Sequence, residues 1–227
     1  MAGADTVSGM TSSPESGWAV PADADSPHEG GFRARMDITT DRGGPRYGEF
    51  SEEIRRLMDL ARYACPTPEI TDELIDQVRA LNKRLEDVQI DEWRSPAGTR
   101  IDLPARGNIT LPPYEISEGG PDGVVASVTF RPFHLGGNDA AHGGHVAVAF
   151  DDLGGMASAL AVQGITRTAY LTVSYRSLTP LRTPLRMHTW VENLDGRKAF
   201  VKGTLHDGDR LCADLDALFI ALKPGQP

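Results

Sequence analysis

The segment from Asn138 to Asp151 contains the residues whose types and order best suit chemistry. It begins Asn-Asp-Ala-Ala-His-Gly-Gly-His and continues through an apolar run to the final aspartate. Gly143 and Gly144 follow a predicted strand and immediately precede a predicted helix, where the lack of a side chain lets a ligand approach the backbone. The first N–H groups of a helix lack intrahelical partners and carry partial positive charge. They would stabilise a carbonyl oxygen that gains negative charge, although a plain strand-to-helix turn would have the same composition.

Asp151 is the second chemical signal, because it is an acid inside an apolar helix. Helical spacing places it on a face of mostly small residues, namely Gly144, Ala147, Val148, Gly155 and Ser158. Small side chains leave room beside the carboxylate for a ligand or a second chain. Since an unpaired buried carboxylate is costly, we expect Asp151 to have a chemical purpose. The alternative is that Asp151 or its neighbour Asp152 caps a nearby loop N–H.

The elements around this segment indicate an α+β fold. Residues 124–133 are β-rich, residues 144–162 predict an apolar helix of small residues, and four β-type stretches follow at 168–176, 185–193, 198–206 and 210–222. Turn signals such as Asp195-Gly196 and Asp207-Gly208 separate these stretches. A strand, a long buried helix and an antiparallel meander predict a sheet wrapped around one central helix, which is the hotdog fold.

The rest of the chain is predicted to be an N-terminal addition to this domain. Residues 1–48 lack apolar periodicity and are expected to be largely disordered. Residues 49–122 are expected to hold a helix from near Phe50 with Ser51 as its N-cap, a second helix from Thr71, and an irregular connection over 94–122. One apolar stripe marks the second helix, formed by Leu74, Val78, Leu81 and Leu85. The hotdog domain is then expected over 123–227.

Charge and composition exclude several classes of protein. The 227-residue chain has a formal net charge of −9, whereas a general nucleic-acid binder needs an excess of Lys and Arg to contact phosphates. Cys65 and Cys212 form neither a CxxC pair nor a disulfide ladder, which indicates a reducing cytoplasm. The start does not resemble a secretion signal, and no run approaches the roughly 20 apolar residues of a bilayer span. The sequence predicts a soluble cytoplasmic protein without a membrane partner.

Four motifs between Val124 and Lys223 have the order and spacing of a known family. They are His142-Gly-Gly followed seven residues later by Asp151, the strand Thr168-Ala-Tyr-Leu-Thr-Val-Ser-Tyr-Arg176, the turn Asn193-Leu-Asp-Gly-Arg-Lys-Ala-Phe200, and the strand Leu218-Phe-Ile220. Each motif is weak alone, and their order makes the match specific. Together they resemble the hotdog-fold acyl-CoA thioesterases, in the branch that includes the phenylacetate-pathway and human enzymes.

The resemblance implies a role for each residue of the segment. The N–H groups of Gly143 and Gly144 would polarise the thioester carbonyl. Asp151, reaching over from the other subunit, would act as nucleophile or as the base that activates water. His142 and Asn138 would hold the substrate carbonyl or the local loop. The family's usual Asn stands about six residues before the His, whereas Asn138 stands four before it.

Thr168 would orient the attacking water in such a site. Its strand parity is opposite to that of Leu171, Val173 and Tyr175, which form the apolar set of the same strand. Only a β-bulge between Thr168 and this set would turn its side chain toward the helix.

Basic residues are concentrated downstream of the helix. Between residues 163 and 202, Glu192 and Asp195 stand against seven basic residues, namely Arg167, Arg176, Arg182, Arg186, Arg197, Lys198 and Lys202. This local reversal of charge is expected where coenzyme A phosphates bind, and a solvated strand face is the alternative. The family places the Gly-Arg-Lys turn near the nucleotide. Arg197 and Lys198, together with Arg176, are therefore the candidates for coenzyme A binding.

The resemblance implies hydrolysis of an acyl-CoA thioester to a carboxylate and free CoA, without metal or cofactor, in a homodimer or a dimer of dimers. One alternative is a hotdog-fold dehydratase or hydratase acting on a CoA- or carrier-bound acyl chain. His134 after Arg-Pro-Phe weakly resembles the catalytic histidine of those enzymes. Another is a non-catalytic acyl-CoA-binding protein. A zinc site at His142 and His145 is not expected, because His-x-x-His suits zinc only when both residues share a helix.

Overall fold

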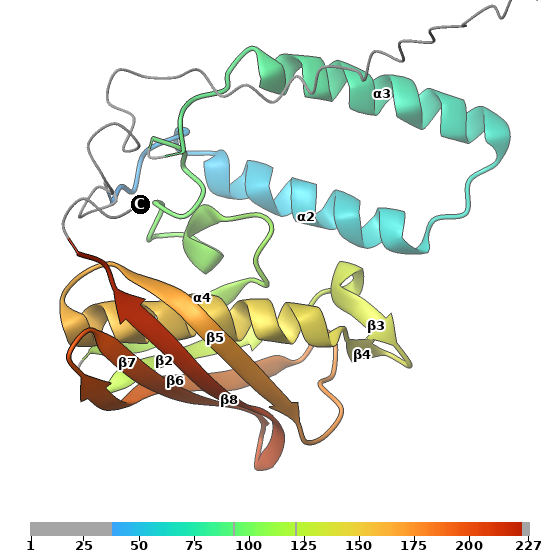
Figure 1. The fold of residues 1–227 in the computed structure, drawn as a ribbon. Coiled ribbons are helices and arrows are strands. Elements are labelled where there is room, and N and C mark those ends of the chain that lie inside the picture. The colour runs from blue at the N-terminus through green and yellow to red at the C-terminus, as the bar shows by residue number, and fades with distance from the viewer. Residues whose placement is uncertain (1–37, 93, 121, 224–227) are drawn as a thin grey trace, which may run out of the picture.

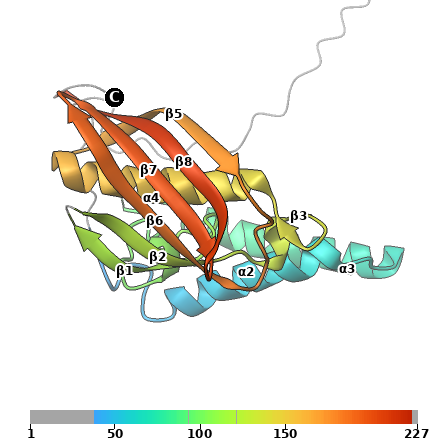
Figure 2. The same cartoon turned by 90° about the horizontal axis from the view of Figure 1, so that it is seen from below.

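Six antiparallel strands form one sheet around helix α4, which confirms the predicted α+β hotdog architecture (Figure 1). The computed structural model describes residues 38–92, 94–120 and 122–223. The sheet has the order β1-β2-β6-β7-β8-β5, so β1 and β5 are its two edges (Figure 2). Its strands are β1 (Tyr114–Gly120), β2 (Gly123–Thr129), β5 (Thr166–Tyr175), β6 (Pro184–Asp195), β7 (Lys198–Asp207) and β8 (Arg210–Ala221). A small hairpin of β3 (Leu135–Gly137) and β4 (Ala140–Ala141) precedes α4.

Helix α4 (Gly143–Val162) lies at the centre of the core, with Phe150 and Leu153 fully buried. Gly154 lets the helix approach the sheet, since an added Cβ would stand 3.3 Å from the Phe219 ring. By length and composition alone this helix could also cross a bilayer, which differs from the expectation that no run would be long enough. In the structure, one face of the helix packs against the strands of the sheet and forms the core with them.

Strand β1 lies inside the stretch 94–122 that the sequence predicts to be irregular. The sheet therefore begins at Tyr114, and the predicted boundary at residue 123 is too late. Tyr114 pairs with Val128 of β2 and is the one fully buried residue of the strand. A bulge between Ile116 and Glu118 interrupts the pairing. An edge strand with a single buried residue and a bulge offers no apolar alternation for a sequence pattern to detect.

Helices α2 (Tyr47–Tyr63) and α3 (Pro68–Glu86) are present as predicted, but each begins three residues early. Ser51 is not an N-cap, because it is buried within α2 and donates to the Tyr47 carbonyl at 2.9 Å. Helix α3 is capped by Thr67, whose hydroxyl accepts from the Ile70 N–H at 3.4 Å. Proline is well suited to the first helical position that follows this cap.

Arg100 organises the residues just before α2. Its guanidinium donates to the carbonyls of Arg42 and Gly44 and pairs with Asp102, while Thr39 forms a parallel bridge with the Arg100 backbone. The predicted disorder of residues 1–48 is therefore wrong for residues 38–48. The remainder of that prediction, over residues 1–37, lies outside the described part of the chain.

Helix α2 is fixed to the hotdog domain by polar contacts. The Asp59 carboxylate accepts from the Arg131 guanidinium at 2.6 Å and from the Phe133 N–H at 3.2 Å. Arg55, which is buried, donates to the Asn108 carbonyl at 2.8 Å. Arg131 and Phe133 belong to the turn η2 (Pro132–His134) and its cap, which lead into the site segment.

Candidate active site

His142 caps the N-terminus of helix α4. Its backbone is extended, and its imidazole Nδ1 accepts from the Gly144 N–H at 3.0 Å. Because this bond occupies Gly144, the structure differs from the expectation that both glycines would offer an N–H to a ligand. Among the described residues the Gly143 N–H has no acceptor. Gly143 is therefore the donor that remains for a developing oxyanion.

Tyr175, the last residue of β5, lies against Gly143. Its hydroxyl donates to the Gly143 carbonyl at 2.8 Å. A Cβ on Gly143 would stand 2.9 Å from the Tyr175 ring, which is shorter than any ordinary carbon contact. A side chain at position 143 would therefore displace Tyr175 from this position. The sequence pattern did not single out Tyr175 as a partner of the glycines.

Asn138 lies at the tip of the β3–β4 hairpin, where the chain turns between the two strands. Asn138 and Asp139 both have positive φ, 50° and 57°, and together form the two-residue turn between the strands. Asparagine and aspartate tolerate this left-handed conformation better than most residues, and it is typical of tight hairpin turns. The structure thus gives Asn138 a backbone role, with an exposed side chain.

Three histidine rings lie together behind the cap. His134 is fully buried, its Nδ1 accepts from the Arg131 N–H at 2.8 Å, and its carbonyl accepts from the His142 N–H at 2.8 Å. Its ring centroid is 4.6 Å from that of His145, which lies 6.1 Å from that of His142. Burial, and to a smaller extent the neighbouring His145, lower the pKa of His134 to about 3. His134 is therefore a neutral structural residue that holds the cap.

Asp151 is exposed in the single chain, in contrast to the buried carboxylate that the sequence led us to expect. The Thr168 hydroxyl donates to its Oδ1 at 2.7 Å. Strand β5 has a bulge between Thr168 and Tyr170, which is the feature needed to turn Thr168 toward the helix. The face of α4 around Asp151 is uncovered as well, since Gly144 and Val148 are both exposed. No described residue of the same chain buries this carboxylate, because the side of α4 that carries it faces away from the core.

Gly143 and Asp151 are too far apart to act together within one chain. Eight residues separate them along α4, which corresponds to about 12 Å of helix rise. A general base must lie within about 3 Å of the proton that it takes, or reach it through one water. The two groups could therefore act on the same thioester only if they came from different chains.

Asp152, the neighbour of Asp151, points about 100° away around the helix and belongs to a network that the sequence did not reveal. It forms an ion pair with Arg106 at 2.9 Å and accepts from the Tyr114 hydroxyl at 2.5 Å. Burial and the Asp152 charge raise the pKa of Tyr114, so its hydroxyl remains a donor. Arg106 also reaches the Met156 sulfur at 2.8 Å. Asp152 therefore ties α4 to the segment before β1 and is an anchor of the fold.

The three candidate residues for coenzyme A binding are not brought together in one chain. Arg176 pairs with Asp214 at 2.5 Å beyond the end of β5. Arg197 and Lys198 lie in the β6–β7 turn at the other end of the sheet, and both are exposed. Lys198 of β7 and Arg167 of β5 both pair with Ile220 of β8, so Arg167 lies at the same end of the sheet as the β6–β7 turn. Nine residues of strand separate Arg167 from Arg176, which corresponds to about 30 Å.

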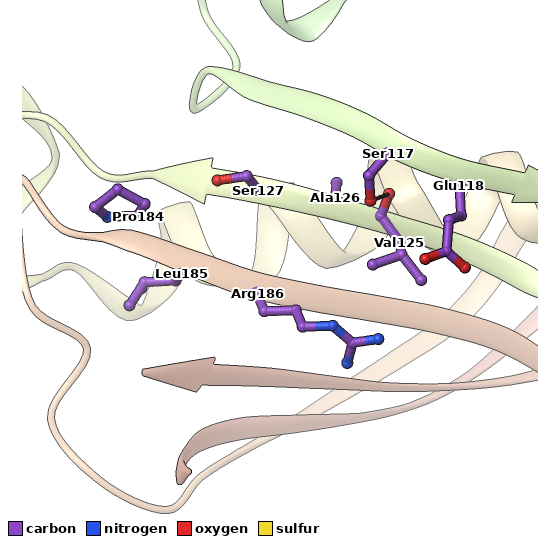
Figure 3. A pocket seen from close by; sticks show the side chains of 8 residues that line it. All are labelled: Ser117, Glu118, Val125, Ala126, Ser127, Pro184, Leu185 and Arg186. Atoms are coloured by element: carbon purple, nitrogen blue, oxygen red, sulfur yellow. Dashed lines mark hydrogen bonds between the residues drawn. The ribbon is translucent and has the colours of Figure 1, made fainter. Parts of the chain in front are cut away.

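One hollow of about 260 Å³ lies on the outer face of the sheet, away from all of these residues (Figure 3). Figure 3 shows Glu118 and Arg186 projecting on either side of Val125, and it contains none of the predicted site residues. Within the part of the chain that the structure describes, no group of three or more His, Cys, Asp or Glu side chains could hold a metal ion.

Comparison with known proteins shows which family and which solved structures this chain is similar to. Residues 138–213 match the family model described as Thioesterase superfamily. The crystal structure of a thioesterase superfamily protein superposes with a TM-score of 0.65 at 23% identity, covering 81% of this chain and 98% of that one. The shared fold thus extends beyond the hotdog sheet into the N-terminal segment. The fold around α4 is thus a hotdog fold, and residues 138–213 are similar to the thioesterase superfamily.

Two curated relatives make the resemblance more specific. The chain is 34% identical over 88 residues to acyl-coenzyme A thioesterase THEM4 of Rattus norvegicus, covering 38% of this chain and 37% of the relative. It is 36% identical over 95 residues to the protein of the same name from Xenopus laevis, covering 41% of this chain and 42% of the relative. The chain thus spans about two fifths of the length of these relatives. The predicted resemblance to acyl-CoA thioesterases is confirmed.

Proposed function

We propose that this protein hydrolyses acyl-CoA thioesters to a free carboxylate and CoA. The similarity to acyl-coenzyme A thioesterases supports the reaction class. The observation that carries the proposal is the hydrogen bond between Thr168 and Asp151, because the bulge in β5 turns this threonine toward the carboxylate on α4. An uncapped N–H at Gly143 supplies the second part of the chemistry.

The proposed reaction uses water and the groups of the protein, with no metal or cofactor. The thioester carbonyl oxygen accepts a hydrogen bond from the Gly143 N–H, where the helix dipole favours negative charge. Thr168 occupies Oδ1 of Asp151, which leaves Oδ2 to take a proton from water or to attack the carbonyl itself. If water attacks, Asp151 takes its proton, the new C–O bond forms, the C–S bond breaks, and the proton passes from Asp151 to the departing CoA sulfur. If Asp151 attacks, the C–S bond breaks as an acyl anhydride with Asp151 forms, and water then hydrolyses this anhydride, which frees the carboxylate and supplies the proton to the CoA sulfur.

The separation of about 12 Å along α4 implies that two chains build each site. Strand β5 offers the surface for this, since its ten residues form one edge of the sheet and a long uncovered edge is a template for pairing. Antiparallel pairing of two β5 strands across a two-fold axis would place the Tyr175 end of one beside the Thr168 end of the other. The Gly143 of one chain would then meet the Asp151 of its partner.

The same symmetric pairing would also gather the basic residues. It would bring Arg176 of one chain to the end of the sheet where Arg197 and Lys198 of the other chain lie. Phosphate groups of coenzyme A could then be bound by cations from both chains. This arrangement explains why the three candidates are separated within a single chain.

The two alternative functions receive less support from the geometry. His134 cannot serve as the catalytic histidine of a dehydratase, because its ring is fully buried and holds the Arg131 N–H. A protein that only binds acyl-CoA would have no need for a threonine aimed at an exposed carboxylate.

Hydrolysis of acyl-CoA substrates of graded chain length, followed by the release of free thiol, tests the proposal. Asp151→Asn should lower kcat by at least about 100-fold, the scale of losing a general base, with KM little changed. Glu118→Gln is the control, because this exposed acid lies on the opposite edge strand. Undiminished hydrolysis by Asp151→Asn would contradict the mechanism. Binding of acyl-CoA by the wild type without any hydrolysis would favour the acyl-CoA-binding alternative.

A further inference from the structure

Helix α3 has an apolar face that the described part of the chain leaves uncovered. None of its residues is buried, and Leu74, Ile75 and Val78 each expose 41–43% of their surface. The hydrogen bonds and ion pair of its side chains stay within α3 and its immediate flanks. Figure 1 shows α3 as the outermost element, with α2 between it and the hotdog domain. Helix α3 therefore lacks the polar anchors that Arg55 and Asp59 provide for α2.

The apolar residues of α3 have the spacing of a helix that packs against other helices. Leu74, Val78, Leu81 and Leu85 alternate at four and three residues, which is the spacing of a coiled-coil seam. Ile70 and Ile75 flank this seam and widen it. A lone helix of this length is marginal in water, so packing of its apolar face must supply most of its stability. No described element of the same chain supplies that packing.

The charges of α3 point to a second copy as the partner. Its first half carries acids and its second half is mainly basic, with the order Glu69, Asp72, Glu73 and Asp76, then Arg79, Lys83, Arg84 and Glu86. An antiparallel copy would place the acidic half of each helix beside the basic half of the other, and would also oppose the two helix dipoles favourably. A parallel copy would place like charges side by side.

We propose that α3 pairs antiparallel with α3 of a second copy of this chain across a two-fold axis. In the register that matches the two seams, Leu74 packs opposite Leu85 and Val78 packs opposite Leu81 of the partner helix. This surface is separate from the β5 edge, because α2 lies between α3 and the hotdog domain (Figure 1). The two contacts can therefore coexist. The α3 contact does not depend on hydrolytic activity.

The mass of the full chain in solution tests this pairing. Leu74→Lys with Val78→Lys places two charges in the seam, and should halve the mass that light scattering reports for the wild type. Glu118→Lys makes the same change of net charge on strand β1, away from α3, and should keep the wild-type mass. A monomeric wild type, a seam variant of unchanged mass, or a control that dissociates equally would overturn the proposal. Hydrolysis per chain, measured in parallel, reports on the proposed function separately.

A disulfide between chains tests the register directly. In a chain with Cys65→Ser, molecules carrying Val78→Cys are mixed with molecules carrying Leu81→Cys and oxidised mildly. The mixture should form a cross-linked pair in several-fold greater yield than either variant alone. Equal yields from all three samples would overturn the antiparallel register. Flotation of the wild type with phosphatidylcholine vesicles, without self-association, would assign the apolar face to a lipid surface and overturn the proposal as well.

Discussion

Replacing Gly143 with proline should remove one hydrogen-bond donor while leaving the helix in place. Proline is favoured at the first position of a helix, where the missing N–H has no intrahelical partner. The preceding residue must then be extended, and His142 already has φ −63° and ψ 132°. The substitution therefore changes the proposed oxyanion donor and little of the backbone around it.

The expected loss follows from the role of that donor. Removing one oxyanion hydrogen bond costs about 100- to 1000-fold in kcat, or about 3–4 kcal/mol of transition-state stabilisation. Gly143→Ala is the matched control, because it keeps the N–H and also brings a Cβ to the Tyr175 ring, at 2.9 Å if nothing moves. Tyr175 is exposed and can rotate away. Alanine should therefore cost no more than about tenfold, the value of one ordinary hydrogen bond.

The assay compares kcat for acyl-CoA hydrolysis in the two variants, with thermal unfolding as a check that both are folded. A loss in Gly143→Ala equal to that in Gly143→Pro would refute the reasoning, because the damage would then come from displacing Tyr175. Full activity in Gly143→Pro would show that the Gly143 N–H is not the oxyanion donor.

Three further predictions concern other parts of the site. Thr168→Val should lower kcat about fivefold, the value of roughly 1 kcal/mol for an exposed hydrogen bond to a charged group, whereas Thr168→Ser should keep the activity; equal losses would remove Thr168 from the mechanism. Changing Arg197 and Lys198 together to Ala should raise KM for acyl-CoA about tenfold, equivalent to 1.4 kcal/mol, and the effect should fade with salt. A short thioester without the nucleotide should be unaffected, so a parallel loss would make the turn merely structural. Because the folded pKa of His134 is about 3 and its ordinary value is 6.5, stability should be complete above pH 6.5. It should fall by up to about 1.4 kcal/mol per pH unit as the pH drops toward 3. Urea unfolding at pH 7 and pH 5 should show a smaller difference in His134→Gln than in the wild type, and an equal difference would contradict this assignment.

The hotdog core could be predicted from sequence because its signals are local and strong. Helix α4 is an almost wholly apolar run, and Asp-Gly turns separate β6, β7 and β8, so the bounds differ from the predicted ones by only one or two residues in most cases. Strand β1 and the bridge at Thr39 could not be predicted in the same way. Their order comes from pairing with distant segments, and their own residues are mostly polar and exposed.

The sequence names candidate residues for the site, but it does not give their geometry. Gly143, Asp151 and Thr168 are positioned by three features that sequence spacing does not reveal. The use of the Gly144 N–H by the His142 ring depends on a rotamer. The direction of Thr168 depends on a bulge. The exposure of Asp151 depends on which face of α4 the sheet covers, whereas an apolar helix alone suggests burial on every side.

Asp152 shows why neighbouring residues of one type can have unrelated roles. One residue of helix turns the side chain by 100°, which takes Asp152 from the open face to the pair with Arg106 and the Tyr114 hydroxyl. These partners lie 46 and 38 residues away in sequence. No local pattern could have paired them, and Asp152→Asn is consequently a poor control for Asp151→Asn.

Complementation between two inactive chains tests most directly whether the site is shared. Chains with Asp151→Asn and chains with Gly143→Pro are co-expressed with different tags, and the mixed dimers are purified through both tags. Each mixed dimer then has one site with both defects and one site with none. The shared site predicts about half of the wild-type activity for a two-fold dimer, far above either parent. Mixed dimers that remain as inactive as their parents would place Gly143 and Asp151 of one chain in the same site, and would contradict the proposed mechanism.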